Sequence, residues 1–284
     1  MLRWFIASAL LVVLPAAGLS AAELTGTLAQ VKQTGKIRIG FREVQPPMSS
    51  LGKEGVPVGY AIDLCAEVVA EVRKTIGGEV AVEYVPVTAG NRFDALADNH
   101  IDLLCEATTR TISRGEKVDF TLPTFVTGAA FMTLKETSVK NGFAGRKIGV
   151  VKGTTTLAEL RKLLDETRAA ATIVELDATA QGVSALDKRE IDAFAADQVV
   201  LIGLVLSSAN PAGYVVLSDL FSFEPFALAL RRNDADFRLV ADRVLARLCR
   251  SKEILKIYDK WFGGFSGRRI SAFDAMVQLN ALPE

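Results

Sequence analysis

The sequence predicts an α/β protein of two lobes, each a mostly parallel sheet flanked by helices, joined by two crossings of the chain. Short apolar strands alternate with amphipathic helices, which is the pattern of parallel sheets covered on both faces. Two extended, aromatic-rich segments, 120–133 and 221–231, interrupt this alternation. The chain has 284 residues, half of them apolar, so its length suits two ordinary domains.

Residues 1–22 are predicted to form a cleaved secretory signal peptide. Arg3 supplies a positive charge, residues 4–14 form an apolar run that ends at Pro15, and small residues occupy 20–22. We therefore expect a mature chain that begins at Glu23 and is located in the periplasm. A membrane anchor is the alternative, but the apolar run is shorter than the roughly 18–20 residues that span a bilayer.

The first part of the chain begins with a strand over residues 36–41 (KIRIGF). Segment 58–74 has apolar residues at positions 61, 65, 68 and 72, a spacing that buries one face of a helix. A strand over 80–85, a short helix over 93–98 and a strand over 101–105 continue the alternation. The middle of the chain repeats it in six segments: 148–151, 154–164, 172–176, 178–187, 192–196 and 198–206.

The two interrupting segments are interpreted as crossings between the lobes. We expect a discontinuous first lobe, residues 23–125 plus 225–284, and a second lobe of residues 126–224. Beyond the second crossing, two helical stripes need a sheet to cover: Phe237, Val240, Val244 and Leu248 in one, and Ile254, Tyr258 and Trp261 in the other.

Charge and motifs exclude several functions. Basic and acidic residues balance at 33 each and are scattered, so neither nucleic acid nor an anionic membrane surface is expected as a partner. The single histidine, His100, is expected in a solvated loop, which excludes a histidine-containing metal cluster and a Ser/His/Asp relay. No glycine-rich nucleotide motif follows a strand. We therefore predict no catalytic residues, metal or cofactor.

The mature chain has three cysteines, Cys65, Cys105 and Cys249. An oxidising compartment favours a disulfide. We expect it between Cys65, on a predicted helix, and Cys105, at the end of a predicted strand, with Cys249 free. Three inert buried thiols are the alternative, because the sequence cannot place two Cα atoms within bridging distance.

Polar side chains follow several predicted strands, at the edge where open parallel sheets bind ligands. They are Arg42, Asn91-Arg92, Thr108-Thr109-Arg110 with Arg114, Gly153 to Thr156, and Asp197. Gly153 permits a tight turn before a helix whose free N–H groups and threonine hydroxyls suit an anion. Arg114 can hold a carboxylate with its planar guanidinium, and Asp197 can accept from an ammonium group. These are the two charges of every α-amino acid.

Each of these residues also has a structural interpretation. Arg42 and Arg92 can be surface charges, and Arg114 can pair with Glu116 or Asp119. Thr154, Thr155 and Asp197 can cap helices, a role compatible with ligand binding. Trp261 and Phe262 are expected to pack in the core.

The residues resemble a known family, the bacterial extracellular solute-binding proteins of the polar amino-acid type, and among these the glutamate/aspartate-binding proteins. The resemblance covers nearly all of residues 30–265. It depends on the order and spacing of short matches: 37–43, 58–60 with Asp63, Asn91-Arg92, 105–109 with Arg114, 118–121, 153–155, 193–194 with Asp197, and 257–262.

The resemblance implies a type II periplasmic binding protein of an ABC uptake system. It places the α-carboxylate on Arg114, Thr109 and the Thr154-Thr155 turn, and the α-ammonium on Asp197. It places a side-chain carboxylate on Arg42 and Arg92, since leaving two buried arginines unpaired would cost several kcal/mol, roughly 3 to 5. Glu224 is a weaker candidate at the hinge. Ala89, Ala107 and Thr179 stand where those relatives have Ser, Ser and a ligand-contacting His.

We therefore expect a monomer that binds an acidic amino acid by closure of its lobes and delivers it to a membrane permease. Two alternatives share this fold. One is a secreted dehydratase of cyclohexadienyl carboxylic acids, for which Glu106 and Glu224 are the only candidate acids. The other is a ligand-sensing subunit of a membrane receptor, whose binding site would look the same.

Overall fold

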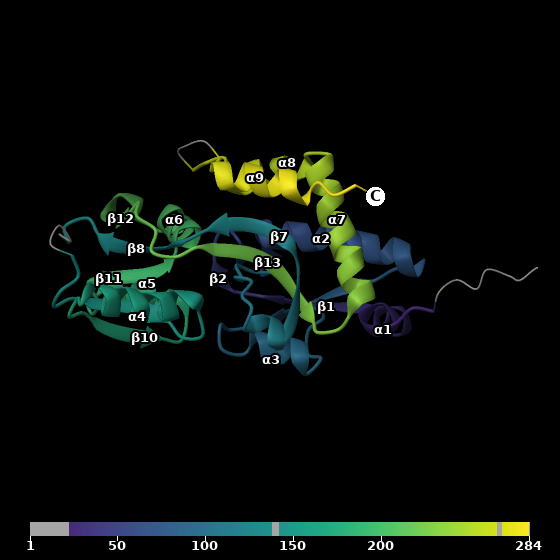
Figure 1. The fold of residues 1–284 in the computed structure, drawn as a ribbon, viewed down its shortest axis with the longest axis horizontal. Coiled ribbons are helices and arrows are strands. Elements are labelled where there is room, and N and C mark those ends of the chain that lie inside the picture. Colours follow the sequence, from purple (N-terminus) through teal and green to yellow (C-terminus); the bar gives the residue numbers. More distant parts are fainter. Residues whose placement is uncertain (1–22, 138–141, 266–268, 284) are drawn as a thin grey trace, which may run out of the picture.

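The computed structural model describes residues 23–137, 142–265 and 269–283. In this part of the chain, two five-stranded sheets lie one beyond the other along the long axis of the molecule, each with its own helices (Figure 1). A third, small sheet joins β2 (Val44–Gln45), β3 (Ser49–Leu51) and β4 (Pro57–Val58). The predicted signal peptide lies outside the described residues.

The first sheet has the strand order β5-β1-β6-β13-β7. Its strands are β1 (Lys36–Phe41), β5 (Ala81–Pro86), β6 (Leu103–Leu104), β7 (Val118–Thr127) and β13 (Glu224–Arg231). β1 pairs in parallel with β5 and β6, whereas β13 is antiparallel to β6 and β7. The sheet is therefore mixed, because the chain leaves it along β7 and returns along β13 in the opposite direction.

The second sheet has the order β10-β9-β11-β8-β12. Its strands are β8 (Ala129–Leu134), β9 (Lys147–Val151), β10 (Thr172–Leu176), β11 (Ala193–Asp197) and β12 (Tyr214–Val216). β9 is parallel to β10 and β11, and β8 is antiparallel to β11 and β12. The antiparallel strands are β7, β8 and β13, which lie in or beside the predicted crossings, and β12, which follows α6 (Gln198–Ser207). The strands that are joined by helices are parallel, as expected, so each sheet is mixed.

The helices of the first sheet are α1 (Gly26–Thr34), α2 (Tyr60–Ile76), α3 (Arg92–Ala97), α7 (Ala235–Arg250), α8 (Glu253–Phe262) and α9 (Ser271–Asn280). Those of the second are α4 (Thr155–Thr167), α5 (Thr179–Asp187) and α6 (Gln198–Ser207). The predicted strand and helix segments are confirmed to within a few residues. Among the described residues, no helix has the length and apolar character needed to cross a membrane.

Alternation along β13 builds two cores on the two faces of the first sheet. Ala227 and Ala229 belong to a cluster with residues of α3, whereas Leu228 and Leu230 belong to the main core with α2 and α7. Successive side chains of a strand point to opposite faces, so one apolar run supplies both cores. The predicted stripe of α7 is buried: Phe237, Val240, Val244 and Leu248 are each at most 6% exposed.

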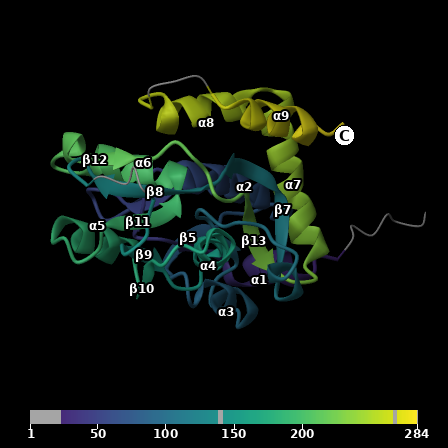
Figure 2. The same ribbon diagram turned by 60° about the vertical axis from the view of Figure 1, so that its left-hand side comes forward.

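The C-terminal segment packs against the first sheet beside β7 and α7 (Figures 1 and 2). Phe273 of α9 is fully buried against Phe125 and Tyr258. The Asn280 side-chain amide donates to the Pro123 carbonyl at 2.6 Å. Trp261 is only partly buried, and its indole N–H donates to Asp63 at 2.6 Å.

The two crossings run close together between the sheets. Glu224 of β13 lies opposite Thr127 of β7, and the register of this pair of strands shifts near Phe226 and Ala227. Gly128, between β7 and β8, approaches the Ser222 carbonyl so closely that any side chain there would collide with it. Adjacent extended crossings can act as a hinge.

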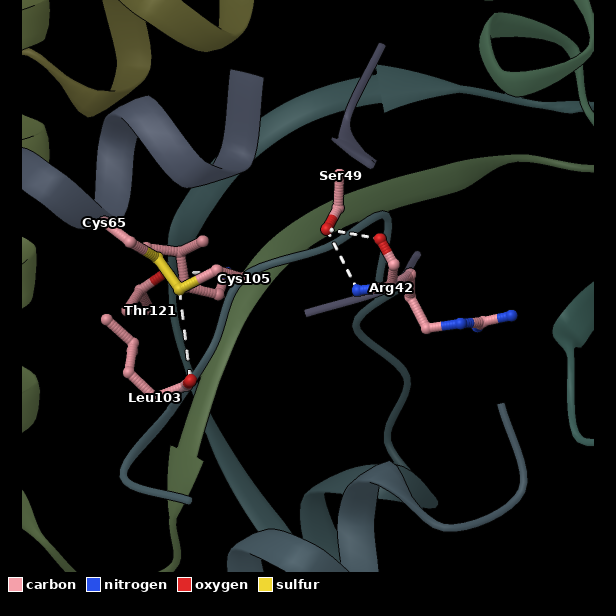
Figure 3. The surroundings of a disulfide bond; sticks show 7 residues. Arg42, Ser49, Cys65, Leu103, Cys105 and Thr121 are labelled. Carbon is pink, nitrogen blue, oxygen red and sulfur yellow. Dashed lines mark hydrogen bonds between the residues drawn. A yellow bond between two sulfur atoms is a disulfide. The ribbon is translucent and has the colours of Figure 1, made fainter. Parts of the chain in front are cut away.

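A disulfide joins Cys65 of α2 to Cys105 at the end of β6, and Cys249 is free and buried (Figure 3). The expected pairing is thus confirmed. The bond ties the main helix of the first sheet to the strand end that precedes residues 106–109. In Figure 3 the Arg42 side chain points away from the disulfide, while its backbone N–H donates to Ser49 at 3.0 Å.

Candidate ligand-binding site

The predicted site residues lie where the two sheets face each other. The first sheet and its loops carry Arg42 after β1, Arg92 at the start of α3, Thr109 beside β13, and Arg114 in a short 3-10 helix, Arg114–Glu116. The second carries Thr154 and Thr155 at the start of α4, Thr179 at the start of α5, and Asp197 at the end of β11. Glu224 is the first residue of β13, in a crossing.

Direct contacts join the two sides. The guanidinium groups of Arg92 and Arg114 donate to the Gly153 carbonyl at 3.3 and 3.4 Å. Thr109 Oγ1 lies 3.3 Å from Thr155 Oγ1. Gly153 has a φ of 72°, and a Cβ there would lie 2.9 Å from the Ala89 carbonyl oxygen. Glycine thus allows the turn before α4 to contact the first sheet's loops.

Two arginines of the first side lie against the same aromatic ring. Arg92 and Arg114 place their guanidinium carbons 4.6 and 5.2 Å from the centre of the Phe93 ring. Arg114 also donates to the Thr109 carbonyl at 2.7 Å. Burial lowers the pKa of Arg92 to about 10 and that of Arg114 below its usual value, and the neighbouring cations add to the effect at Arg92. Both remain charged at neutral pH.

Glu106 is the residue that the sequence analysis did not place in the binding site. Its carboxylate is fully buried and lies 2.9 Å from Arg92 Nε and 3.3 Å from Arg42 Nη1. Thr108 Oγ1 donates to it at 2.5 Å. Arg42 and Arg92 therefore have a carboxylate partner within the chain, so the cost of leaving them unpaired does not by itself require a ligand carboxylate. The sequence did contain a signal for this role, because Glu106 follows Cys105 at the end of a strand, where the other predicted site residues also lie.

Glu224 joins the two sides through hydroxyl groups. Its Oε2 accepts from Thr109 Oγ1 at 2.5 Å and from Thr155 Oγ1 at 2.8 Å, and its Oε1 accepts from Ser222 Oγ at 2.7 Å. Side chains of both sheets and of the crossing thus meet at one carboxylate. The hydroxyls predicted to hold a ligand carboxylate are the same ones that Glu224 engages.

Asp197 stands at the N-cap position of α6, but its side chain makes no capping hydrogen bond. Its Oδ1 is buried and has no hydrogen-bond partner among the described residues, although other atoms of Asp197 are partly exposed. Burial, with the nearby charges of Glu224 and Glu106, raises the pKa of this carboxyl to about 8. A buried carboxylate without a donor is suited to accept from a cationic ligand group.

Thr154 and Thr155 have different roles although they are adjacent. Thr154 caps α4, because its Oγ1 accepts from the Leu157 N–H at 3.3 Å and donates to the Val151 carbonyl at 2.7 Å. Thr155 faces the other sheet through Glu224 and Thr109. The capping interpretation is thus confirmed for Thr154, and for Asp197 it is wrong.

A cavity of about 30 Å³ lies between the two sides. Arg42, Gln45, Thr154, Thr156, Thr179 and Asp197 contribute its polar lining. A cavity of this size can hold water but no larger ligand. Gln45 was not predicted; it is buried, and its Oε1 accepts from the Ala107 N–H at 2.9 Å.

Comparison with known proteins identifies the family. The model of the bacterial extracellular solute-binding proteins, family 3, matches residues 37–264. The chain belongs to this family of solute-binding proteins. The resemblance noted from the short sequence matches is therefore confirmed, and so is the fold class of a type II periplasmic binding protein.

Two characterised relatives and one solved structure illustrate the similarity. The chain is 31% identical to the L-glutamate/L-aspartate-binding protein of Pseudomonas aeruginosa, over 90% of this chain and 86% of that one. It is 28% identical to the glutamate/aspartate import solute-binding protein of Escherichia coli K12, over 90% and 87%. The fold matches the cysteine-binding protein of Campylobacter jejuni with a TM-score of 0.75 at 24% identity, covering 88% of this chain and 98% of that one.

Proposed function

We propose that this solute-binding protein is a periplasmic monomer that binds an α-amino acid with an acidic side chain and delivers it to an ABC-type permease without converting it. The observation that carries the proposal is that Arg114, Thr155 and Asp197 come together where the two sheets meet. A guanidinium and the hydroxyl-bearing start of a helix suit an α-carboxylate, and the unpartnered carboxylate of Asp197 suits an α-ammonium.

Binding is proposed to proceed by closure of two lobes, residues 23–125 plus 225–284 and residues 126–224. The small cavity between them and the close passage of Gly128 beside Ser222 support a hinge at the crossings. The contacts of Gly153 with Arg92 and Arg114 would then form on closure. Burial of the ligand strengthens its charge pairs, because the surroundings become less polarisable than water.

The acidic side chain is proposed from Arg42 and Arg92, together with the glutamate/aspartate-binding relatives. Both guanidinium groups are buried, and Arg42 lines the cavity beside Thr179 and Asp197. A ligand carboxylate would accept from Arg42 at the place where Glu106 now lies. Glu106 and Glu224 both engage several donors, which favours binding over the acid catalysis of the dehydratase alternative.

A thermal-shift screen of the ligand-stripped mature protein against the common amino acids and against cyclohexadienyl carboxylic acids tests this function. A ligand at 100 times its Kd adds about 2.7 kcal/mol to the free energy of unfolding. We expect glutamate or aspartate to raise the melting temperature and no compound to be consumed. If no amino acid shifts the melt, or if a cyclohexadienyl acid is converted, the proposed function is wrong.

A further inference from the structure

Two cations and one anion make up the region proposed to receive the ligand side chain. Arg42 and Arg92 hold the carboxylate of Glu106 between them, at 3.3 and 2.9 Å. The Glu106 side chain is fully buried, and that of Arg42 is 8% exposed. We propose that Glu106 is a specificity-determining residue, and that it makes the site accept a side-chain primary amide, as in glutamine or asparagine, at least as well as a carboxylate.

Arg92 and Arg42 differ in the number of protein acceptors that their N–H groups already contact. Arg92 donates to two backbone carbonyls, those of Ala89 and Gly153, in addition to pairing with Glu106. Among the described residues, the Arg42 guanidinium pairs with Glu106 alone, and Arg42 also lines the cavity. A ligand side chain in the cavity would therefore meet the remaining donors of Arg42, with the carboxylate of Glu106 directly behind them as the partner of Arg42.

A primary amide matches both groups. Its oxygen can accept from Arg42, and its N–H can donate to Glu106. A carboxylate can accept from Arg42, but it has no N–H to donate to Glu106, and two neighbouring carboxylates repel each other in a buried site. An acidic ligand must therefore displace Glu106 from the arginines, whereas an amide leaves the Glu106 ion pairs in place.

The charge balance of the whole site also favours an amide side chain over a carboxylate. Three arginines, Arg42, Arg92 and Arg114, lie with three acids, Glu106, Asp197 and Glu224, and Glu106 forms ion pairs with two of the arginines. When the ligand's ammonium group ionises Asp197, the three charges of each sign are equal, and a zwitterion with an amide side chain keeps this balance. An acidic amino acid adds one negative charge that no further buried cation of the set offsets.

The test is isothermal titration of the ligand-stripped mature protein with L-glutamate and L-glutamine, for the wild type, Glu106→Gln and the control Glu166→Gln, an exposed residue of α4. We expect the wild type to bind glutamine at least as tightly as glutamate. In Glu106→Gln we expect the ratio of the two dissociation constants to move at least tenfold toward glutamate, with no change in the control. A wild type that binds glutamate more tightly than glutamine, or a ratio that moves less than tenfold in Glu106→Gln, overturns the proposal.

A second measurement needs only the wild type, so it remains informative if Glu106→Gln does not fold. The γ-methyl ester of glutamate can accept from Arg42 but cannot donate to Glu106. We expect it to bind at least tenfold more weakly than glutamine, and equal binding overturns the inference. The inference rests on the proposed binding of an amino acid between the lobes; failure of that function would appear separately, as no binding of either amino acid to the wild type.

Discussion

The two sides of the binding site use different chemistry. The first sheet and its loops contribute long charged side chains, Arg42, Arg92 and Arg114, around the buried Glu106. The second contributes the starts of helices, with Thr154, Thr155 and Thr179, and the single carboxylate of Asp197. In the proposed function, the first side distinguishes ligand side chains by charge, and the second closes over the ligand with short side chains and backbone.

The two sides also differ in how their residues are held in place. The segment before Glu106 is tied to α2 by the Cys65–Cys105 disulfide, and the arginines are paired or stacked on Phe93. Residues 126–224 contain no cysteine, and Asp197 has a buried oxygen without a partner. We therefore expect the charged side to be held by the protein itself, and the carboxylate of Asp197 on the opposing side to be stabilised by the proposed ligand. Four predictions test this expectation.

Among the substitutions, the largest effect at neutral pH is expected from removing the disulfide. Cys65→Ser with Cys105→Ser opens a cross-link between residues 40 apart in the sequence. Loop-closure entropy predicts a loss of about 4 kcal/mol in the free energy of unfolding. Urea unfolding monitored by circular dichroism measures this loss. Cys249→Ser is the control. An equal loss of unfolding free energy in that variant would show that replacing any buried cysteine destabilises the protein, whether or not it is cross-linked.

Arg114→Ala is expected to weaken binding of every amino acid by about 3 kcal/mol, a hundredfold or more in Kd, because the α-carboxylate loses its charged partner. Arg110→Ala, which removes an exposed arginine four residues away, is the matched control. Titration calorimetry with several amino acids measures the effect. If Arg114→Ala weakens the binding of only some amino acids, Arg114 contacts the ligand side chain and not the α-carboxylate.

Asp197 is expected to make the stability of the ligand-free protein depend on pH. Its folded-state pKa is raised to about 8, so the folded protein binds a proton that the unfolded chain has already released between about pH 4 and 8. The free energy of unfolding should therefore fall as the pH rises through this range, by up to about 1.4 kcal/mol per pH unit.

Melting temperatures at pH 5 and pH 8 measure this dependence. Asp197→Asn should remove much of the fall, because an amide remains neutral throughout. A bound amino acid should also reduce it, since the ammonium group stabilises the ionised carboxylate. An unchanged pH dependence in Asp197→Asn would assign the effect to another group.

The smallest effects are expected at two adjacent threonines. Thr154→Ala removes the cap of α4 and should lower the free energy of unfolding by about 1 kcal/mol. Thr155→Val removes a hydroxyl of the site and should weaken binding by about 0.5–1.5 kcal/mol, roughly two- to twelvefold in Kd. Chemical unfolding and titration of both variants separate the two roles. If both variants change the same quantity, the division of roles is wrong.

Much of the fold could be predicted from local patterns. The strand KIRIGF and the helix that carries Cys65 each show their own periodicity, and nine-residue α5 begins one residue from its expected start. The antiparallel direction of β13 could not be read in this way, because an extended apolar segment has the same pattern in either direction. The β2-β3-β4 sheet was missed, since its strands are only two or three residues long.

The sequence by itself determined the alternation of strands and helices, the residue types at the strand ends and the family resemblance, because each depends on neighbours along the chain. Only the tertiary structure decided which charges meet. Glu106 pairs with Arg42 from 64 residues away, and Glu224 accepts from Thr109 and Thr155, which lie 115 and 69 residues away. Such pairs depend on how whole sheets pack, and electrostatic energies depend on the final distance and burial. The arginines that suggested an acidic ligand therefore gained their internal partner only through folding.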